Sequence, residues 1–308
     1  MDLSVVIPCY NEQESLAETH KRVKAACDAA DLSSYEIIFV NDGSKDDTVS
    51  IMEALHRQDP AVVIVDLSRN YGHQIALTAG MSHARGDYIF ILDADLQDPP
   101  ELLAPMLERA RAGADVVYGQ RQERQGETWF KLVMARSFYR ILSWLSDIHI
   151  PENVGDFRLI SRRVLEQFLA MPEHQRFIRG MIAWIGFRQE AFPYTRDPRF
   201  AGVTKYPFHK LVQFAFDAIS GFSIKPLRIS MVFAIFGTLL AGFLGLLAIW
   251  AYFDHKTVSG WASLACIITF FSSMQLICLG VIGEYIGRTY IEVKNRPLFI
   301  VKTLLRAK

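Results

Sequence analysis

Residues 88–95 read Tyr-Ile-Phe-Ile-Leu-Asp-Ala-Asp, an apolar run that ends on two carboxylates. A short run of β-branched and aromatic side chains predicts a buried strand. Similar runs occur at Leu3–Ile7, Glu36–Val40, Val62–Val65 and Asp115–Tyr118. Segments with helical periodicity lie between them, namely Leu16–Ala30, Thr48–His56, Gln74–Ala84 and Glu101–Ala110. This alternation predicts an α/β domain with a mainly parallel, Rossmann-like sheet that helices cover on both faces.

Polar and acidic residues follow most of these strands. They are Pro8–Glu12 after the first strand, Asn41–Thr48 after the second, Asp93–Pro100 after the fourth and Gly119–Arg121 after the fifth. In an open α/β sheet, ligands bind at the carboxyl ends of the strands. We therefore expect these segments to converge on one ligand-binding edge.

Asp93 and Asp95 form an Asp-x-Asp triplet at the end of the fourth strand. Neighbouring carboxylates repel each other, and a divalent cation that bridges carboxylate and diphosphate oxygens relieves the repulsion. A solvated strand end explains such a triplet equally well. Asp42 could bind a base or a ribose, or it could form a turn. Arg121 could hold phosphate oxygens, or it could be an ordinary surface charge.

Two long segments, Ile229–Phe253 and Trp261–Gly283, contain no Asp, Glu, Lys, Arg or His, although 21% of the 308 residues are Asp, Glu, Lys or Arg. A helix rises about 1.5 Å per residue and crosses a hydrocarbon core of roughly 30 Å in about 20 residues. Buried core helices seldom stay uncharged for much more than about 14 residues, so we favour membrane spans over core helices. The short link at 254–260 predicts an antiparallel hairpin.

Basic residues lie mostly on one side of this hairpin. Lys225 and Arg228 precede the first span, and the connecting loop contains only Lys256. The second span is followed by Arg288, Lys294, Arg296, Lys302, Arg306 and Lys308. The positive-inside rule therefore predicts a multi-pass protein of the inner (plasma) membrane, with the large domain and both termini in the cytoplasm. The run Leu3–Ile7 is too short for a signal peptide.

Four regions are expected: a catalytic domain at 1–200, an amphipathic juxtamembrane region at 201–228, the hairpin at 229–283 and a cytoplasmic tail at 284–308. Apolar residues of 205–226 share one helical face, which fits a helix in the membrane interface or one packed on the soluble core. The basic and aromatic stretch 129–140 is a second interfacial candidate. Formal net charge is zero and the four cysteines form no CxxC pair, so neither a nucleic-acid partner, a disulfide framework nor a zinc site is indicated.

Three motifs of this chain resemble those of inverting family 2 glycosyltransferases with the GT-A fold: Val5–Glu12, Val40–Asp46 and Leu92–Pro99. Three others resemble the polyisoprenyl-phosphate branch of that family, which includes dolichol-phosphate mannose synthases and bactoprenol glucosyltransferases: Asn153–Leu159, Gly202–Tyr206 and Gly283–Tyr290. Together these motifs span nearly the whole chain. The resemblance implies metal-dependent transfer of a sugar, with Mg²⁺ or Mn²⁺, from a nucleotide sugar to a lipid phosphate.

The resemblance also implies roles for residues of the donor site. Asp42 would contact the nucleotide base, Asp93 the ribose or the metal, and Asp95 with Gln97 the metal and the diphosphate. The nucleoside pocket would be shaped by Pro8, Tyr10 and Glu12. Arg121 would pair with the diphosphate, and a cation from the loop before the juxtamembrane helix would close over it, the candidates being Arg196, Arg199 and Lys205.

Acceptor binding is implied for Lys131, Arg136 and Arg140, because cations near a bilayer surface suit a phosphate. Contact with anionic lipid is an equally good interpretation of these three residues. Asp156 occupies the position proposed in the family as the catalytic base. A phosphate monoester has a second pKa of about 6, so it needs little help to lose its proton. Asp156 could therefore orient the acceptor or hold Arg158 instead.

The implied reaction is transfer of glucose from UDP-glucose to undecaprenyl phosphate, with inversion at the anomeric carbon, for cell-envelope glycan modification. Other donors of the same chemistry remain open, including mannose, galactose, N-acetylgalactosamine and an aminoarabinose derivative. A membrane adaptor that binds nucleotide sugar without turnover is the alternative from another class. Small residues in the first span, Gly237, Ala241, Gly242 and Gly245, could pack a homo-oligomer or the hairpin itself.

Overall fold

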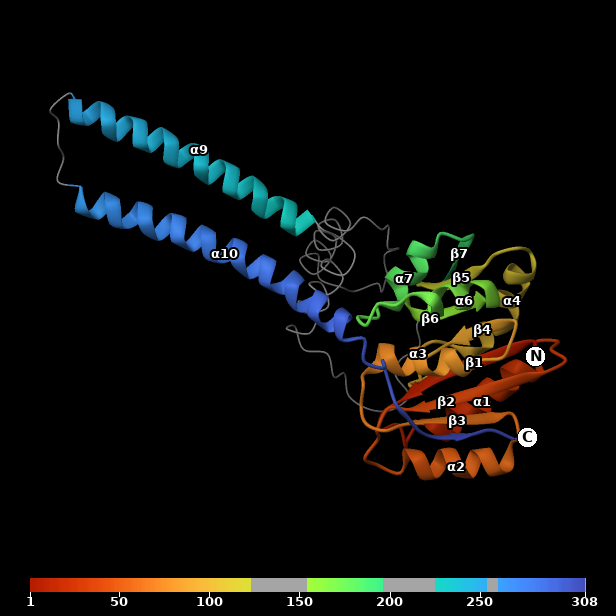
Figure 1. Cartoon of the computed structure of the whole chain (residues 1–308). Helices are drawn as coiled ribbons and strands as arrows, with labels where there is room; N and C mark the ends of the chain where they lie inside the picture. The colour runs from red at the N-terminus through yellow and green to blue at the C-terminus, as the bar shows by residue number, and fades with distance from the viewer. Residues whose placement is uncertain (123–153, 196–224, 254–259, 308) are drawn as a thin grey trace. The chain divides into compact units, whose positions relative to one another are not determined.

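The computed structural model describes residues 1–122, 154–195, 225–253 and 260–307 (Figure 1). Its strands are β1 (Leu3–Cys9), β2 (Tyr35–Asn41), β3 (Val62–Leu67), β4 (Tyr88–Ile91), β5 (Val116–Arg121), β6 (Val154–Ser161), β7 (Gln189–Tyr194) and β8 (Val301–Leu305). They form one eight-stranded sheet in the order β7-β5-β6-β4-β1-β2-β3-β8. All five predicted strands are present, with ends that differ by up to three residues.

The sheet is parallel through its centre. β1 pairs in parallel with β2 and β4, and β2 pairs in parallel with β3. β6 lies antiparallel between β4 and β5, β7 is parallel to β5, and β8 is antiparallel to β3 at the sheet's edge. The prediction of a mainly parallel sheet is thus confirmed, but the sequence analysis missed the two antiparallel strands.

Helices cover both faces of the sheet, as predicted. They are α1 (Leu16–Asp28), α2 (Thr48–Gln58), α3 (His73–His83), the 3-10 turn η1 (Pro100–Leu102), α4 (Leu103–Arg111), α6 (Arg162–Ala170) and α7 (Ile178–Ile185). α1 packs against α2 and α4, whereas α3 packs against α6, which in turn contacts α7.

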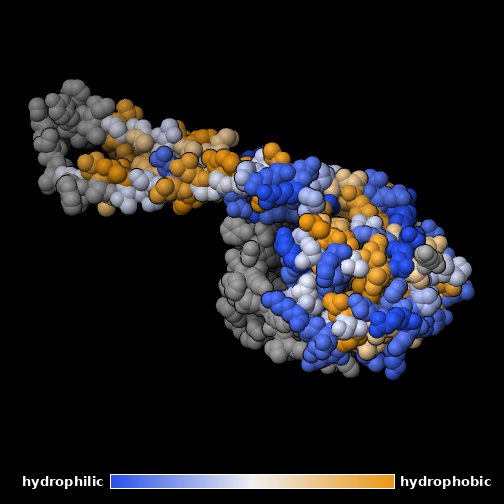
Figure 2. Space-filling view, turned by 60° about the horizontal axis from the view of Figure 1, so that its bottom comes forward, coloured by the Kyte–Doolittle hydropathy of each residue, from blue (hydrophilic) through white to orange (hydrophobic). Residues whose placement is uncertain are grey.

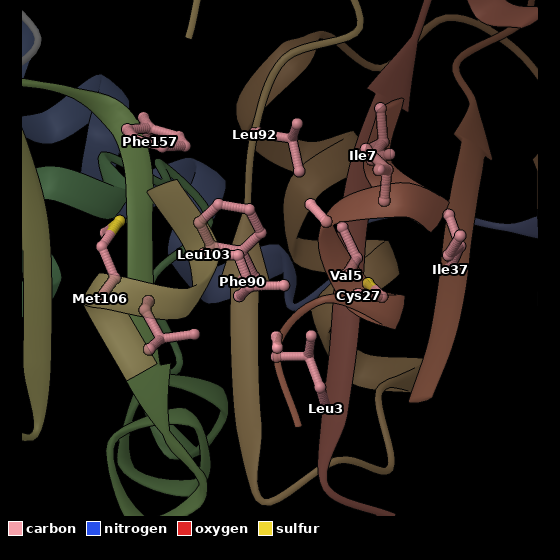
Figure 3. Close-up of a cluster of buried hydrophobic side chains, with 14 of the residues drawn as sticks. Leu3, Val5, Ile7, Cys27, Ile37, Phe90, Leu92, Leu103, Met106 and Phe157 are labelled. Carbon is pink, nitrogen blue, oxygen red and sulfur yellow. The ribbon is translucent and has the colours of Figure 1, made fainter. Parts of the chain in front are cut away.

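Alternate residues of a strand point to opposite faces, so a doubly covered strand must be apolar at successive positions. In β1, Val5 and Ile7 belong to a core that also contains Leu103 of α4, and Figure 3 shows these side chains together. Val6 points to the other face. There α3 approaches so closely that a Cβ on Gly80 would lie 2.4 Å from Val6 Cγ1. A glycine is required at that point for α3 to approach the sheet.

The chain divides into two compact units, and the second consists mainly of α9 (Lys225–Phe253) and α10 (Trp261–Lys294). Leu227–Leu247 and Cys266–Lys294 within them are long and apolar enough to cross a membrane. Their exposed side chains are largely apolar, and orange residues cover much of both helices in Figure 2. This is consistent with the predicted spans.

The two long helices pack against each other. A Cβ on Gly237 would lie 3.2 Å from Met274 Sδ and 3.4 Å from Phe271 Cε1, whereas one on Gly242 or Gly245 would meet nothing within 4 Å. Gly237 therefore lies at the contact between the two helices of the hairpin.

Most of the amphipathic segment predicted at 205–226, and all of the stretch 129–140, lie outside the described residues.

The segment after Gly283 differs from the expected tail. α10 continues to Lys294, and residues 296–308 group with the first unit. β8 pairs with β3, and Ser68 N–H donates to the Ile300 carbonyl. Arg306 then donates from Nη1 to the Glu36 carboxylate and from Nη2 to the His83 carbonyl. The sequence analysis did not predict this short strand, because Lys302 lies within it and Arg306 follows it directly.

Arg306→Ala should destabilise the first unit. Glu36 is 3% exposed, and removal of its cation leaves a buried carboxylate, at a cost of about 3 kcal/mol. Thermal unfolding of the full chain in detergent would show a lower midpoint. Arg57→Ala, which removes an exposed cation 4.0 Å from Glu53, is the matched control and should change the midpoint little. If the two variants unfolded at the same midpoint, the ion pair between Arg306 and Glu36 would not stabilise the domain.

Candidate active site

The carboxyl ends of β1, β2 and β4 lie at one edge of the sheet because these strands are parallel. β6 runs in the opposite direction, so its beginning reaches the same edge. Asp93 follows β4, and Asp156 is the third residue of β6. The predicted convergence of polar strand ends on one edge is confirmed, and the antiparallel strand adds a carboxylate to it.

The loops after β1 and β2 are joined by hydrogen bonds. Asn11 N–H donates to Ser44 Oγ at 3.0 Å, and Glu12 N–H donates to Thr48 Oγ1 at 2.9 Å. Among the residues predicted to shape a nucleoside pocket, Tyr10 is exposed and Glu12 is partly buried. Pro8 is buried within β1, in register with Val40. These contacts hold the two loops together beside the edge.

Asp42 is buried and binds the backbone of the loop after β3. Its Oδ1 accepts the Tyr71 N–H at 2.7 Å, and its Oδ2 accepts the Gly72 N–H at 2.9 Å. Burial raises the pKa of this carboxyl, although both hydrogen bonds oppose the rise. Gly72 has φ 96°, a conformation that favours glycine. Asp42 thus fixes the backbone immediately before α3.

His73 is the first residue of α3 and lies between two carboxylates. Its Nε2 is 3.3 Å from Asp156 Oδ2 and 3.5 Å from Asp93 Oδ1. Burial alone would lower the pKa of the imidazole, but the charges of Asp93 and Asp156 outweigh it and raise the pKa to about 9. The two carboxylates therefore favour the protonated form of His73.

Asp156 is held on both oxygens. Arg179 donates from Nε to Oδ1 at 2.9 Å and from Nη2 to Oδ2 at 3.2 Å, and Gln74 Nε2 donates to Oδ2 at 2.9 Å. Burial would raise the pKa of Asp156, but Arg179 and His73 hold it well below its usual range. The sequence analysis suggested Arg158 as a partner of Asp156. That was wrong for the carboxylate, because Arg158 donates to the backbone carbonyls of Asp156 and Gly155 instead.

Asp93 provides the observation that tests a metal site. Its Oδ1 is buried and receives no hydrogen bond from any group in the described part of the chain. Burial raises the pKa of this carboxyl, His73 opposes the rise, and the charges of Asp156, Asp98 and Asp95 add to it. A buried carboxylate oxygen of this kind fits a hard divalent cation. Asp95 is also buried, and its Oδ1 accepts the Gln97 N–H at 3.2 Å.

Within the described ranges, no three His, Cys, Asp or Glu side chains are grouped to hold a metal ion by themselves. Mg²⁺ is commonly bound by one or two carboxylates, with the remaining ligands supplied by waters and substrate phosphates. Asp93 and Asp95 fit that pattern.

Arg121 forms a cluster with two residues at the same edge. Its Nε donates to Tyr194 Oη at 3.2 Å, and its Nη2 lies 3.5 Å from Asp98 Oδ2. Tyr194 in turn donates its hydroxyl proton to Asp98 Oδ1. Burial would lower the pKa of Arg121, but the charge of Asp98 and the bond to Tyr194 raise it. Arg121 is thus a charged group at the position where the sequence predicted a diphosphate ligand.

Six predicted cations lie outside the described residues, so their positions are not assigned: Lys131, Arg136, Arg140, Arg196, Arg199 and Lys205. Five residues at the edge were missed by the sequence analysis: His73, Gln74, Asp98, Arg179 and Tyr194. His73 lies after the third strand, and Asp98 lies within the acidic motif Leu92–Pro99. Arg179 and Tyr194 follow the acidic motif by about 80 and 100 residues, and no local pattern marks them.

A mainly parallel α/β sheet, covered on both faces and acidic at its ligand-binding edge, is the architecture of a GT-A glycosyltransferase domain. The comparison with protein families agrees. The model described as glycosyl transferase family 2 matches residues 4–169, more than half of the chain. This chain belongs to glycosyl transferase family 2, and the resemblance seen in its motifs is confirmed.

Curated relatives match the chain over nearly its full length. It is 46% identical to the uncharacterized glycosyltransferase YkcC of Bacillus subtilis (strain 168), over 97% of this chain and 93% of that protein. It is 42% identical to the prophage bactoprenol glucosyl transferase homolog of Escherichia coli (strain K12), over 98% and 99%. It is 41% identical to the bactoprenol glucosyl transferase of Shigella phage SfII, over 98% of each.

Tyr194→Phe should destabilise the edge. The change removes a hydroxyl that donates to the buried Asp98 and accepts from Arg121, and we expect a loss of about 1–3 kcal/mol. The thermal midpoint of the full chain in detergent would measure it. Tyr35→Phe is a matched control, since the Tyr35 hydroxyl donates to Asp28 at an exposed position. If both variants unfold like the parent, the hydrogen bonds of the Tyr194 hydroxyl contribute nothing to stability.

Proposed function

We propose that this chain transfers a sugar, with inversion, from a nucleotide sugar to a polyisoprenyl phosphate, most simply glucose from UDP-glucose to undecaprenyl phosphate. The observation that carries this proposal is the 41–42% identity, over 98% of this chain, to two proteins named for bactoprenol glucosyl transfer. The match covers α9 and α10 as well as the GT-A domain, so it supports the lipid acceptor together with the donor chemistry. The lipid-linked sugar would then serve cell-envelope glycan modification.

The acidic edge is the donor site in this proposal. Asp93 and Asp95 would hold Mg²⁺ or Mn²⁺ with the diphosphate, and Gln97 would lie beside them. The bound ion would neutralise the charge that develops on the departing nucleotide. Arg121, the last residue of β5, would pair with the diphosphate. Pro8, Tyr10, Glu12 and Asp42 would shape the nucleoside pocket, and one of Arg196, Arg199 or Lys205 would close over the diphosphate.

The acceptor would approach from the bilayer surface. Lys131, Arg136 and Arg140 are the proposed cations for its phosphate. Because this phosphate is largely ionised at neutral pH, catalysis rests on placing it in line with the scissile bond and stabilising the leaving diphosphate. The two long uncharged segments, Ile229–Phe253 and Trp261–Gly283, and the distribution of basic residues support a hairpin whose GT-A domain lies on the cytoplasmic side of the inner membrane.

The proposal is tested by offering radiolabelled nucleotide sugars, with UDP-glucose first, to the full chain and undecaprenyl phosphate in detergent. Label should enter the lipid phase with Mg²⁺ or Mn²⁺ and stay in the aqueous phase after chelation. Transfer from a different donor would correct the sugar and retain the chemistry. Binding of nucleotide sugar without transfer from any donor would favour the adaptor.

Asp95→Asn should lower kcat at least about a hundredfold, because loss of a metal-binding carboxylate removes several kcal/mol of charge stabilisation from the transition state. The assay is the same transfer reaction, with the thermal midpoint measured to show that the variant is folded. Asp31→Asn, at an exposed position after α1, is the matched control and should keep full activity. Wild-type turnover in Asp95→Asn would remove Asp95 from the metal site.

Arg136→Ala should raise the apparent KM for undecaprenyl phosphate about tenfold, as expected for loss of one charge-assisted hydrogen bond. The KM for the nucleotide sugar should change much less. Initial rates at varied lipid and fixed donor, and the reverse, would separate the two constants. An unchanged lipid KM would move the role to Lys131 or Arg140.

A further inference from the structure

Asp66 is a buried carboxylate to which the proposed reaction gives no role. It lies near the end of β3, which pairs with β2 on one side and with the C-terminal β8 on the other (Figure 1), and it is 8% exposed. Its Oδ1 accepts Asn41 Nδ2 at 2.6 Å, and its Oδ2 lies 3.4 Å from Lys302 Nζ. The Lys302 side chain is 68% exposed, so water screens that ion pair. The bond to the buried Asn41 is therefore the stronger of the two contacts.

Asn41 extends this contact to the loop after β2. Its Oδ1 accepts the Ser44 N–H at 3.0 Å, while its Nδ2 donates to Asp66. The carboxylate on one side and the N–H on the other therefore determine the orientation of the Asn41 amide. A change that removed the Asp66 carboxylate would take away the acceptor of a buried donor, which is costly. Asp66 thus fixes the side chain on which the turn at Ser44 depends.

Ser44 connects this turn to the loop after β1. The Asn11 N–H donates to Ser44 Oγ at 3.0 Å, and the Lys45 N–H donates to Asn11 Oδ1 at 2.9 Å. Asn11 has φ 56°, a left-handed conformation that costs free energy for most residues other than glycine and persists where neighbours hold it. It stands between Tyr10 and Glu12, two residues predicted to shape the nucleoside pocket. The conformation of Asn11 therefore sets where these two residues lie.

We propose that Asp66 is a positioning residue for nucleotide binding, which acts through Asn41 and Ser44 to hold Asn11 in its left-handed conformation. Asp66 itself touches no substrate. The side chains involved come from the ends of three neighbouring parallel strands, β3, β2 and β1, so the contacts run across the sheet toward the nucleoside pocket. The inference rests on the proposed function for the identity of the ligand as a nucleoside diphosphate.

Nucleotide affinity of the full chain in detergent tests this role. It is measured by calorimetry in Mn²⁺ with UDP or GDP, whichever the parent binds more tightly. Asp66→Ala removes the acceptor of Asn41 and should weaken binding about tenfold, because the loop must then be ordered when the nucleotide binds. Asp66→Asn keeps an oxygen that can accept from Asn41 Nδ2, so it should restore most of the affinity. Unchanged affinity in Asp66→Ala, or an equal loss in Asp66→Asn, would overturn the inference.

Asp59→Ala is the matched control that separates positioning from loss of stability. Asp59 is 6% exposed, accepts from Lys24 Nζ at 2.9 Å and lies 3.1 Å from His20 Nε2. It precedes β3, at the opposite end of that strand from Asp66. The control should unfold at a lower temperature than the parent and yet bind the nucleotide as tightly. If Asp59→Ala weakened binding as much as Asp66→Ala does, the loss would come from destabilisation, and the positioning role would be overturned.

A double variant tests whether the contacts act as one chain. If Asp66 acts through Ser44, Asp66→Ala combined with Ser44→Ala should weaken binding no more than the stronger of the two single changes. Multiplied losses would show that Asp66 acts independently of Ser44, which is the outcome that contradicts the proposed route.

These binding measurements need no turnover, so they are independent of the transfer assay. If the parent transfers no sugar while Asp66→Ala still loses nucleotide affinity, the proposed function fails and the role of Asp66 stands. If transfer is observed but Asp66→Ala binds the nucleotide normally, only the role of Asp66 fails. If the parent binds neither nucleotide, both fail.

Discussion

Mutual repulsion of carboxylates at one edge of the sheet is the constraint on which the rest of this site depends. The charges of Asp95, Asp98 and Asp156 all raise the pKa of Asp93. In a partly buried position such repulsion is weakly screened. Cations compensate for it: His73 lies between two of these carboxylates, Arg179 binds Asp156, and Arg121 lies beside Asp98. Asp93 Oδ1 remains without a hydrogen bond from the described residues, which leaves a place for a further cation.

The antiparallel strand β6 makes this arrangement possible. In a purely parallel sheet, only the carboxyl ends of strands lie at the ligand-binding edge. β6 is antiparallel to its neighbours β4 and β5, so its amino end lies there instead. Asp156 therefore reaches Asp93 although 63 positions separate them in the chain. The beginnings of α3 and α7 reach the same point and supply Gln74 and Arg179. The reversed strand thus adds the Asp156 carboxylate to the edge, where side chains from two helices bind it.

The C-terminal segment has a structural role in the same domain. After α10 the chain returns to the sheet, pairs with β3 and buries Arg306 against Glu36. The pairing reaches Ser68, at the beginning of the loop whose N–H groups bind Asp42. The catalytic domain is therefore built from both ends of the chain, and α9 and α10 are inserted between its parts. This explains why the domain boundaries cannot be drawn as consecutive blocks.

The sequence by itself determined the alternation of strands and helices, the acidic strand ends, the two long uncharged segments and the family. Each of these depends on local periodicity or on a short motif, as in residues 88–95. The tertiary structure decided the partners of the acidic residues: Asp42 binds backbone, the Asp156 carboxylate binds Arg179 rather than Arg158, and His73 lies between two carboxylates. It also decided that the last residues form a strand of the sheet. These are contacts between residues far apart in the chain, and strand order, which sets them, leaves no local pattern in the sequence.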